Sequence, residues 1–300
     1  MIAAVRPHFG WEIRNRALAL GKRTLLAGVL NVTPDSFSDE GRFFSPEQAV
    51  EHALRLLGDG ADILDIGGES TRPGTRPPLS ASEEIDRILP VIESVRRERP
   101  NAVISIDTYK AETARAAIAA GAEIVNDVSG FLWDSAMAAE CAKLACGVIL
   151  MHTRGTMREW RTHPPLPHDQ VVPLVLRDLR ERVEHALKAG VQPNRVVLDP
   201  GFGFGKAGDE NYPLLANLDA LHALGFPILA GTSRKSFLGK TLQKMYGREV
   251  PPAQREIATA ASITAAILAG AHIVRVHDVT TTREAAAIAD AIREDSSRLD

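Results

Sequence analysis

Short apolar runs alternate with longer amphipathic stretches along the chain, and this alternation repeats eight times. The runs are nearly continuous in hydrophobic residues, which is typical of strands that are buried on both faces of a parallel sheet. The predicted strands are residues 25–32, 61–68, 102–107, 123–129, 147–152, 196–201, 227–233 and 271–278. The pattern therefore predicts eight strand–helix units in sequence order.

Capping signals mark the helices between these strands. Ser45 stands before a proline that suits the first position of a helix. Ser80 and Glu83 have the spacing of a capping box. Glycines just past the helical segments supply the left-handed conformation that commonly ends a helix. These glycines are Gly60, Gly121, Gly190, Gly225 and Gly270.

Eight strand–helix units joined by right-handed crossovers favour a single (β/α)8 TIM barrel of the α/β class. A doubly wound open sheet uses the same alternation, but it normally carries a glycine-rich phosphate turn after its first strand. Here the first strand runs into Asn31-Val-Thr-Pro-Asp35 instead, which favours the barrel. We expect residues 1–24 to form a short capping segment or hairpin at the barrel bottom, and residues 25–300 to form one catalytic barrel domain.

Composition restricts the classes of partner. The chain has 300 residues, of which 45% are apolar and 24% charged, and a formal net charge of −3, so neither nucleic acid nor an anionic membrane is expected as a partner. Cys141 and Cys146 are expected to be buried thiols in a reducing compartment. Charged residues such as Arg6 and Glu12 interrupt the N-terminal region, which is unlike a signal peptide. A cytoplasmic protein is the expectation.

Polar residues lie where the predicted strands end. Because the carboxyl ends of barrel strands meet at one mouth, these side chains are expected to converge there. They are Asn31, Asp65, Glu69, Asp107, Asn126, Asp127, His152, Asp199, Arg275 and His277, together with the run Gly231-Thr-Ser-Arg-Lys-Ser236. One such residue is commonly a helix cap, but polar residues at nearly every strand end indicate a binding site.

The types of these residues indicate the chemistry of the ligand. A carboxylate accepts hydrogen bonds and an amide both donates and accepts, so the Asp and Asn side chains suit a flat heterocycle with several N–H and carbonyl groups. Arginine and lysine at the rim suit phosphate or carboxylate groups, and a helix that begins near Ser236 presents amides to an anion. The residues alone predict an anionic substrate with a polar ring.

Three of the polar residues also have simpler interpretations. Asp127 is expected to cap or brace the site rather than bind a ligand. His152 fits a structural hydrogen bond as well as a ligand contact. Asp65, buried within the second strand, is expected to orient loop residues.

Eight motifs follow one another in a characteristic order, each at the end of a predicted strand. They are Gly28-Val-Leu-Asn-Val-Thr-Pro-Asp-Ser-Phe-Ser38, Gly67-Gly-Glu-Ser-Thr-Arg-Pro-Gly74, Ser105-Ile-Asp107, Asn126-Asp-Val-Ser129, Met151-His152, Asp199-Pro-Gly-Phe-Gly-Phe-Gly-Lys206, Gly231-Thr-Ser-Arg-Lys-Ser236 and Arg275-Val-His-Asp278. With these motifs the chain resembles the dihydropteroate synthases, a family of pterin-binding TIM barrels, from about residue 25 to residue 278. The resemblance implies a transferase that joins 6-hydroxymethyl-7,8-dihydropterin diphosphate to p-aminobenzoate, giving 7,8-dihydropteroate and diphosphate in folate biosynthesis.

The resemblance also implies a role for each matching position. The pterin would be held by Asp107, Asn126, Met151, Asp199, Gly231 and Lys235. The diphosphate would be held by Asn31, Arg275 and His277, with Mg²⁺ between the phosphate oxygens and the Asn31 amide oxygen. p-Aminobenzoate would be surrounded by Thr71, Arg72, Phe204, Lys235 and Ser236. The side chains implied in catalysis are Asn31, Arg72, Asp107, Lys235, Arg275 and His277.

The implied reaction is an SN1-like displacement, because the electron-rich dihydropterin ring can delocalise positive charge at its methylene carbon while diphosphate departs. The resemblance further implies a homodimer, and the Ala-rich segment 258–270 would permit close helix packing. Two alternatives stay open. A methyltetrahydrofolate methyltransferase acting on a corrinoid protein would share the pterin-binding residues, but would not need the Ser-Arg-Lys-Ser and Arg-Val-His clusters. A catalytically silent paralogue would act by binding alone.

Overall fold

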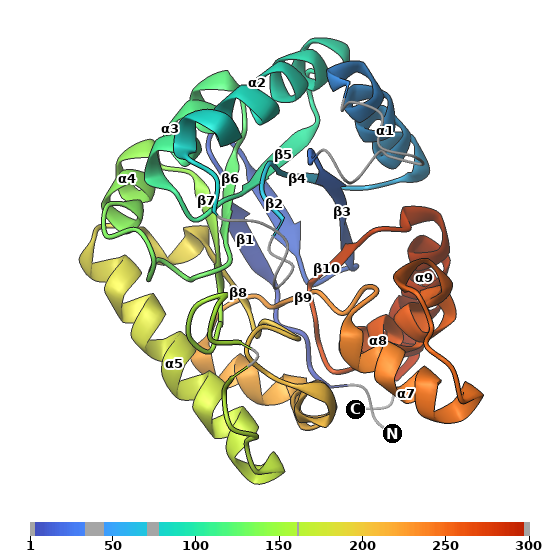
Figure 1. The fold of residues 1–300 in the computed structure, drawn as a ribbon. Coiled ribbons are helices and arrows are strands. Elements are labelled where there is room, and N and C mark those ends of the chain that lie inside the picture. The colour runs from blue at the N-terminus through green and yellow to red at the C-terminus, as the bar shows by residue number, and fades with distance from the viewer. Residues whose placement is uncertain (1–3, 34–44, 71–77, 161, 297–300) are drawn as a thin grey trace.

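The computed structural model describes residues 4–33, 45–70, 78–160 and 162–296. Within them, eight parallel strands form a ring surrounded by helices, and Figure 1 views this ring along its axis. The strands are β3 (Leu25–Asn31), β4 (Ile63–Gly67), β5 (Val103–Asp107), β6 (Ile124–Asp127), β7 (Gly147–Met151), β8 (Val196–Asp199), β9 (Leu229–Ala230) and β10 (Ile273–Val276). They pair in the order β8-β7-β6-β5-β4-β3-β10-β9, and a bridge between Leu198 and Ile228 joins β8 to β9. The closed ring confirms the TIM barrel and excludes the open sheet.

Helices follow the strands around the outside of the ring (Figure 1). They are α1 (Pro46–Asp59), α2 (Ala81–Glu98), α3 (Ala111–Ala120), α4 (Met137–Leu144), α5 (His168–Lys188), α6 (Asn211–Ala216), α7 (Ser236–Tyr246), α8 (Glu256–Leu268) and α9 (Val279–Ser296). The predicted capping box at Ser80 and Glu83 is present, and Gly60 and Gly121 end α1 and α3 in the left-handed conformation. None of the described helices is both long and apolar enough to span a membrane.

The strands are shorter than predicted, by up to five residues in the case of β9. The hydrogen bonds between neighbouring strands end before the apolar run of the sequence does. The residues just beyond the ladder, among them His152, Gly231 and His277, turn into the loops at the mouth of the barrel. Of these three residues, Gly231 and His277 line the mouth, whereas His152 is buried behind it.

The barrel interior consists of two layers, because inward-facing residues recur with a period of two along each strand. The lower layer is apolar, and its members are Leu25, Ala27, Ile63, Val103, Ile124, Ile149, Val197, Leu229 and Ile273. Two residues further along the strands, the same inward direction is taken by Asp65, Asn126, Met151, Asp199, Gly231 and Arg275. The apolar layer is a packed core, and the polar layer forms the floor of the site.

An N-terminal hairpin covers the lower end of the barrel. It consists of β1 (Phe9–Glu12) and β2 (Ala17–Leu20), which pair antiparallel. Trp11 and Ile13 are buried in the lower interior cluster, and the Trp11 indole N–H donates to the Arg195 carbonyl at 2.9 Å. At Gly147 the approach is so close that a Cβ atom would lie 2.8 Å from the Ile13 side chain, so only glycine fits there. The division into a capping segment and a barrel domain stays a prediction.

Candidate active site

A cavity of about 680 Å³ opens at the carboxyl ends of the strands. Every strand of the ring contributes a lining residue within it or within three residues of its end, and for β4 these residues are Glu69 and Ser70. The lining includes Asn31, Asp107, Asn126, Met151, Asp199, Phe204, Gly231, Lys235, Ser236, Arg275 and His277. The structure thus brings together eleven of the thirteen residues predicted from the sequence. The other two, Thr71 and Arg72, lie outside the described residues.

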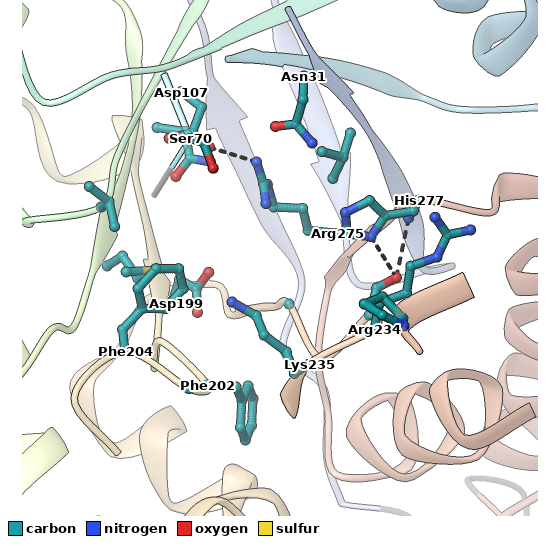
Figure 2. Close-up of a pocket in the computed structure, with 18 of the residues that line it drawn as sticks. Asn31, Ser70, Asp107, Asp199, Phe202, Phe204, Arg234, Lys235, Arg275 and His277 are labelled. Carbon is teal, nitrogen blue, oxygen red and sulfur yellow. Dashed lines mark hydrogen bonds and ion pairs between the residues drawn. The ribbon is translucent and has the colours of Figure 1, made fainter. Parts of the chain in front are cut away.

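Arg275 organises one wall of the cavity. Its guanidinium donates to Asp65 Oδ2 through Nε and to Asp107 Oδ2 through Nη2, at 2.6 Å in each case. Asp65 Oδ2 also accepts a bond of 3.1 Å from the Asn126 amide, so Asp65 orients two site residues at once. Figure 2 shows the Arg275 side chain directed at Asp107. Asp65 was expected to orient loop residues, whereas both of these partners, Asn126 and Arg275, lie within strands.

Burial and neighbouring opposite charges shift the pKa values of the ionisable residues in this wall. Burial raises the pKa of Asp107 to about 7, and Arg275 only partly opposes the rise. Burial would lower the pKa of Arg275, but the adjacent Asp65 and Asp107 outweigh it and raise that pKa. Arg275 therefore stays charged and faces the cavity as a fixed cation.

Asp199 and Lys235 face each other across the deep part of the cavity (Figure 2). The Asp199 Oδ1 accepts from the backbone N–H of Gly201 at 2.7 Å, which fixes the carboxyl plane, and burial raises the pKa of Asp199. The Lys235 Nζ lies 3.8 Å from the centroid of the Phe204 ring, and burial lowers the pKa of Lys235 to about 8. This region can accept N–H donors at Asp199 and offer a cation at Lys235.

The turn from β9 into α7 holds Lys235 in place. Arg234 has a φ of 58°, a left-handed conformation that is strained for a residue other than glycine. Its backbone is held on both sides, since its N–H donates to Thr259 Oγ1 at 3.1 Å and its carbonyl accepts from Arg255 at 2.9 Å. The Arg234 guanidinium pairs with Glu256 on α8, so its charge is partly balanced within the protein. The strained turn directs Lys235 into the cavity.

His277 and Asn31 occupy the neighbouring edge of the mouth, where Figure 2 places them near Arg275. Ser233 Oγ and His277 Nδ1 lie 2.9 Å apart, and the backbone N–H of His277 donates to the same hydroxyl at 3.3 Å. One serine thus contacts both the imidazole and the backbone of His277. Three side chains of this edge, Asn31, Arg275 and His277, are suited to an anionic group.

Some contributors carried little or no sequence signal. Trp160 lies in the loop after β7, lines the cavity and packs edge-on against Phe204 with 5.0 Å between ring centroids. Nothing in its sequence surroundings marked it.

Asp127 is fully buried and accepts from Ser129 and Phe131, which agrees with the bracing role that was expected. His152 is likewise fully buried and takes part in structural contacts with Lys206 and Asp178.

Lys206 gives the site a measurable dependence of stability on pH. Burial lowers its pKa to about 7, while the unfolded chain would bind the same proton up to about pH 10.4. Between these values the folded protein holds fewer protons, so the free energy of unfolding is expected to rise with pH, by at most about 1.4 kcal/mol per pH unit from this group. Urea denaturation of the wild type and of Lys206→Met at pH 7, 8 and 9 measures the slope. Parallel pH dependences in the two proteins would contradict this.

The comparisons with known proteins agree with this geometry. The model of the family described as "Pterin binding enzyme" matches residues 27–277. The dihydropteroate synthase of Bacillus subtilis is 42% identical over 276 residues, which cover 92% of this chain and 91% of that protein. The Xanthomonas albilineans dihydropteroate synthase structure with 4-aminobenzoic acid has a TM-score of 0.86 and 42% identity, covering 96% of this chain and 99% of the other. A Yersinia pestis dihydropteroate synthase structure with a sulfonamide drug has a TM-score of 0.86 and 40% identity, and the match covers 96% of this chain and 100% of the other.

The closed barrel and its polar cavity define a pterin-binding enzyme of the TIM-barrel class. Within that class, the chain belongs to the dihydropteroate synthase family. It is accordingly a transferase of folate biosynthesis, and family membership favours this role over the pterin methyltransferase and the silent paralogue.

Proposed function

We propose that the cavity condenses 6-hydroxymethyl-7,8-dihydropterin diphosphate with p-aminobenzoate, and that the residues described above divide this work among three subsites. The observation that carries the proposal is one continuous cavity in which the carboxyl and amide groups of Asp107, Asn126 and Asp199 lie together with the cations of Lys235 and Arg275. A polar ring with an anionic tail matches this layout.

The pterin subsite consists of the floor residues. Asp199 would accept two hydrogen bonds from the amino and N–H edge of the ring, and Asn126 and Asp107 would contact other ring nitrogens. Lys235 would reach the ring carbonyl, while Met151 and Gly231 would form the walls of the slot. At Gly231 a Cβ atom would come within 3.9 Å of Asp199, so a larger residue there would narrow the slot. The buried, pre-oriented Asp199 supports this assignment.

The diphosphate subsite consists of Asn31, Arg275 and His277. Among the described residues, no three His, Cys, Asp or Glu side chains gather to hold a metal ion, so the substrate phosphates and water would supply most ligands of a bound Mg²⁺. The Asn31 side chain, directed into the same edge of the mouth, fits the remaining position (Figure 2). When bound, Mg²⁺ would neutralise negative charge on the departing diphosphate.

The arylamine subsite lies nearer the surface. Phe204 and Ser236 line the cavity there with Lys235, and Thr71 and Arg72 are proposed to complete it. The Xanthomonas albilineans relative, whose structure contains 4-aminobenzoic acid, supports a p-aminobenzoate site in this family.

The protein's part in the reaction is mainly electrostatic. Arg275 and His277 would stabilise the charge that develops on the diphosphate as the carbon–oxygen bond breaks, and the ring held by Asp199 would share the positive charge left on the methylene carbon. The arylamine nitrogen then attacks that carbon and releases its proton, so no covalent enzyme intermediate is needed. Positional isotope exchange of a labelled bridging oxygen without p-aminobenzoate tests this SN1-like order. Absence of exchange would favour a concerted displacement.

Diphosphate release is the direct test of the proposed function. Release from the dihydropterin diphosphate should require p-aminobenzoate for turnover, and removing Mg²⁺ with a chelator should lower the rate by roughly 10²-fold, since a divalent cation contributes several kcal/mol to such a displacement. Release that is unaffected by the arylamine and the metal would contradict the proposal.

We also propose a cytoplasmic homodimer. The faces of α7 and α8 expose three large apolar side chains, Met245, Tyr246 and Ile257, which is the kind of surface that a partner covers. Sedimentation velocity at micromolar concentration should give twice the mass of the chain, and charged substitutions at Ile257 should give the monomer. A wild-type protein that sediments as a monomer would contradict the dimer.

A further inference from the structure

A row of three polar side chains runs behind the cavity, from the outer helix α5 to the loop after β8. The Lys206 Nζ lies 2.8 Å from His152 Nδ1 and 3.2 Å from the Phe204 carbonyl oxygen. The other ring nitrogen of His152, Nε2, lies 3.2 Å from Asp178 Oδ2. Lys206 and His152 are almost completely buried, yet neither lines the cavity. Burying polar or charged groups costs folding free energy even when they are paired, and the proposed reaction does not use these two side chains directly. Their burial therefore suggests another role.

The direction of each hydrogen bond follows from the charges. Burial would raise the pKa of Asp178, but hydrogen bonds from His152 and Arg177 outweigh it and lower that pKa, so Asp178 is an ionised acceptor. Burial, reinforced by the charge on Lys206, lowers the pKa of His152 to about 3, so the ring is neutral. A neutral ring that donates from Nε2 to Asp178 must accept at Nδ1. Lys206 therefore donates to His152 and to the Phe204 carbonyl, and a neutral amine could still make both bonds.

The loop that Lys206 holds is bonded at its ends, where the Gly203 N–H donates to Asn211 Oδ1 at 2.7 Å and the Asn211 amide donates to the Lys206 carbonyl at 3.1 Å, while the Phe204 N–H donates to the Gly201 carbonyl at 3.2 Å. Phe204 lies between Gly203 and Gly205, which have φ values of 83° and 69°. Glycine in this region is the most permissive backbone, so the segment costs more to order than one with side chains. Apart from Lys206, the Phe204 carbonyl accepts only a longer bond, of 3.4 Å, from the Arg154 N–H among the described contacts. The bond from Lys206, which at 3.2 Å is the shorter of the two, thus anchors the carbonyl side of the Phe204 residue.

The orientation of that ring matters for the cavity. Its face lies 3.8 Å from the Lys235 Nζ, and Trp160 packs against it edge-on. A rotation of the Phe204 peptide would move the ring away from Lys235 and open the surface on which a flat aromatic substrate would rest.

We propose that Lys206 is a positioning residue for the arylamine subsite, and that His152 and Asp178 aim it at the Phe204 carbonyl. The proposal rests on the proposed function and deepens it, because it assigns p-aminobenzoate recognition to a residue that does not touch the substrate. Lys206 acts on the arylamine subsite through Phe204, while its charge also interacts with Asp199 of the pterin subsite. Substitutions of His152, which leave that charge in place, therefore isolate the positioning effect.

Two substitutions of His152 test its contact with Lys206 and its contact with Asp178 separately. In His152→Asn the amide oxygen can take the place of Nδ1 and accept from Lys206, but the contact with Asp178 is lost. In His152→Gln the amide reaches the place of Nε2 and keeps Asp178, but Lys206 loses its acceptor. Both variants lose one buried hydrogen bond of the histidine, so a general loss of stability should affect them similarly.

The KM for p-aminobenzoate is expected to stay within about twofold of the wild type in His152→Asn and to rise roughly tenfold in His152→Gln and in Lys206→Met, the order of magnitude of a lost hydrogen bond to a charged group. The KM for the dihydropterin diphosphate should change by less than about threefold in the two His152 variants, which keep the charge of Lys206 near Asp199. Equal arylamine KM values in the two His152 variants, or parallel rises in both KM values, would overturn the proposal.

Hydrogen exchange provides a readout that needs no turnover. The amides of residues 203–206 should exchange faster in His152→Gln and Lys206→Met than in the wild type and His152→Asn. If the wild type fails to turn over but this difference is found, the proposed function fails and the positioning of Phe204 by Lys206 stands. If exchange is the same in all four proteins, the positioning role is wrong whatever the activity.

Discussion

Asp199→Asn is expected to lower kcat/KM for the dihydropterin diphosphate by roughly 10²–10⁴-fold, because two hydrogen bonds to a charged acceptor contribute about 1.5–3 kcal/mol each. The amide has nearly the same shape and its oxygen can still accept from the Gly201 N–H. Its NH₂ group, however, would face an N–H donor of the pterin. Steady-state kinetics with each substrate varied in turn measure the effect.

The same substitution should leave the fold intact. Burial raises the pKa of Asp199, so the buried carboxylate itself destabilises the folded protein and a neutral amide removes that cost. Thermal denaturation of Asp199→Asn is therefore expected at the wild-type temperature or above it. An active Asp199→Asn protein, with kcat/KM within about tenfold of the wild type, would show that the ring is recognised elsewhere.

Arg275→Met is expected to have the largest combined effect on activity and stability. Removing this guanidinium leaves two buried carboxylates, Asp65 and Asp107, without the cation that bonds to both, and breaking a buried pair in this way costs about 3–5 kcal/mol. The diphosphate also loses a fixed cation, so kcat/KM should fall by at least about 10²-fold. Urea denaturation and diphosphate release measure the two losses separately.

Two comparisons distinguish these causes. Adding Asp65→Asn and Asp107→Asn to Arg275→Met should restore much of the stability but none of the activity. Arg275 lowers the pKa of Asp107, so without Arg275 that pKa should rise above about 7, and the stability loss of Arg275→Met alone should shrink as pH falls towards about 7. In that range Asp107 of the variant binds a proton that the wild-type carboxylate does not yet bind. A loss that grows towards low pH, or activity that returns with stability, would contradict the dual role.

The barrel could be predicted from the sequence because each strand is buried on both faces and each helix carries its own capping signals. The same regularity revealed most of the site, since polar residues that end apolar runs in a barrel gather at its mouth, although Asp127 and His152 are buried behind it. Asn31, Asp107, Asn126 and Asp199 were found in this way. Prediction worked where local pattern and tertiary position are linked.

Other features depend on contacts between distant segments and leave no local pattern. Lys206 and His152 are 54 residues apart, and His152 and Asp178 are 26 apart, so only the folded chain shows that they form one row. Arg234 is similar, because its pairing with Glu256 and its strained backbone are set by α8. Trp160 resembles any other loop aromatic until the barrel places it beside Phe204.

The hairpin beneath the barrel has a kinetic consequence. Since Trp11 and Ile13 fill the lower end, nothing can enter or leave the interior from that side. Both substrates must then arrive through the same opening, and the one that binds at the floor must come first. An arylamine in the outer subsite would obstruct it, so high arylamine concentrations should inhibit competitively against the pterin substrate. Of the products, diphosphate should leave first, and dihydropteroate, whose pterin ring occupies the floor, should leave last.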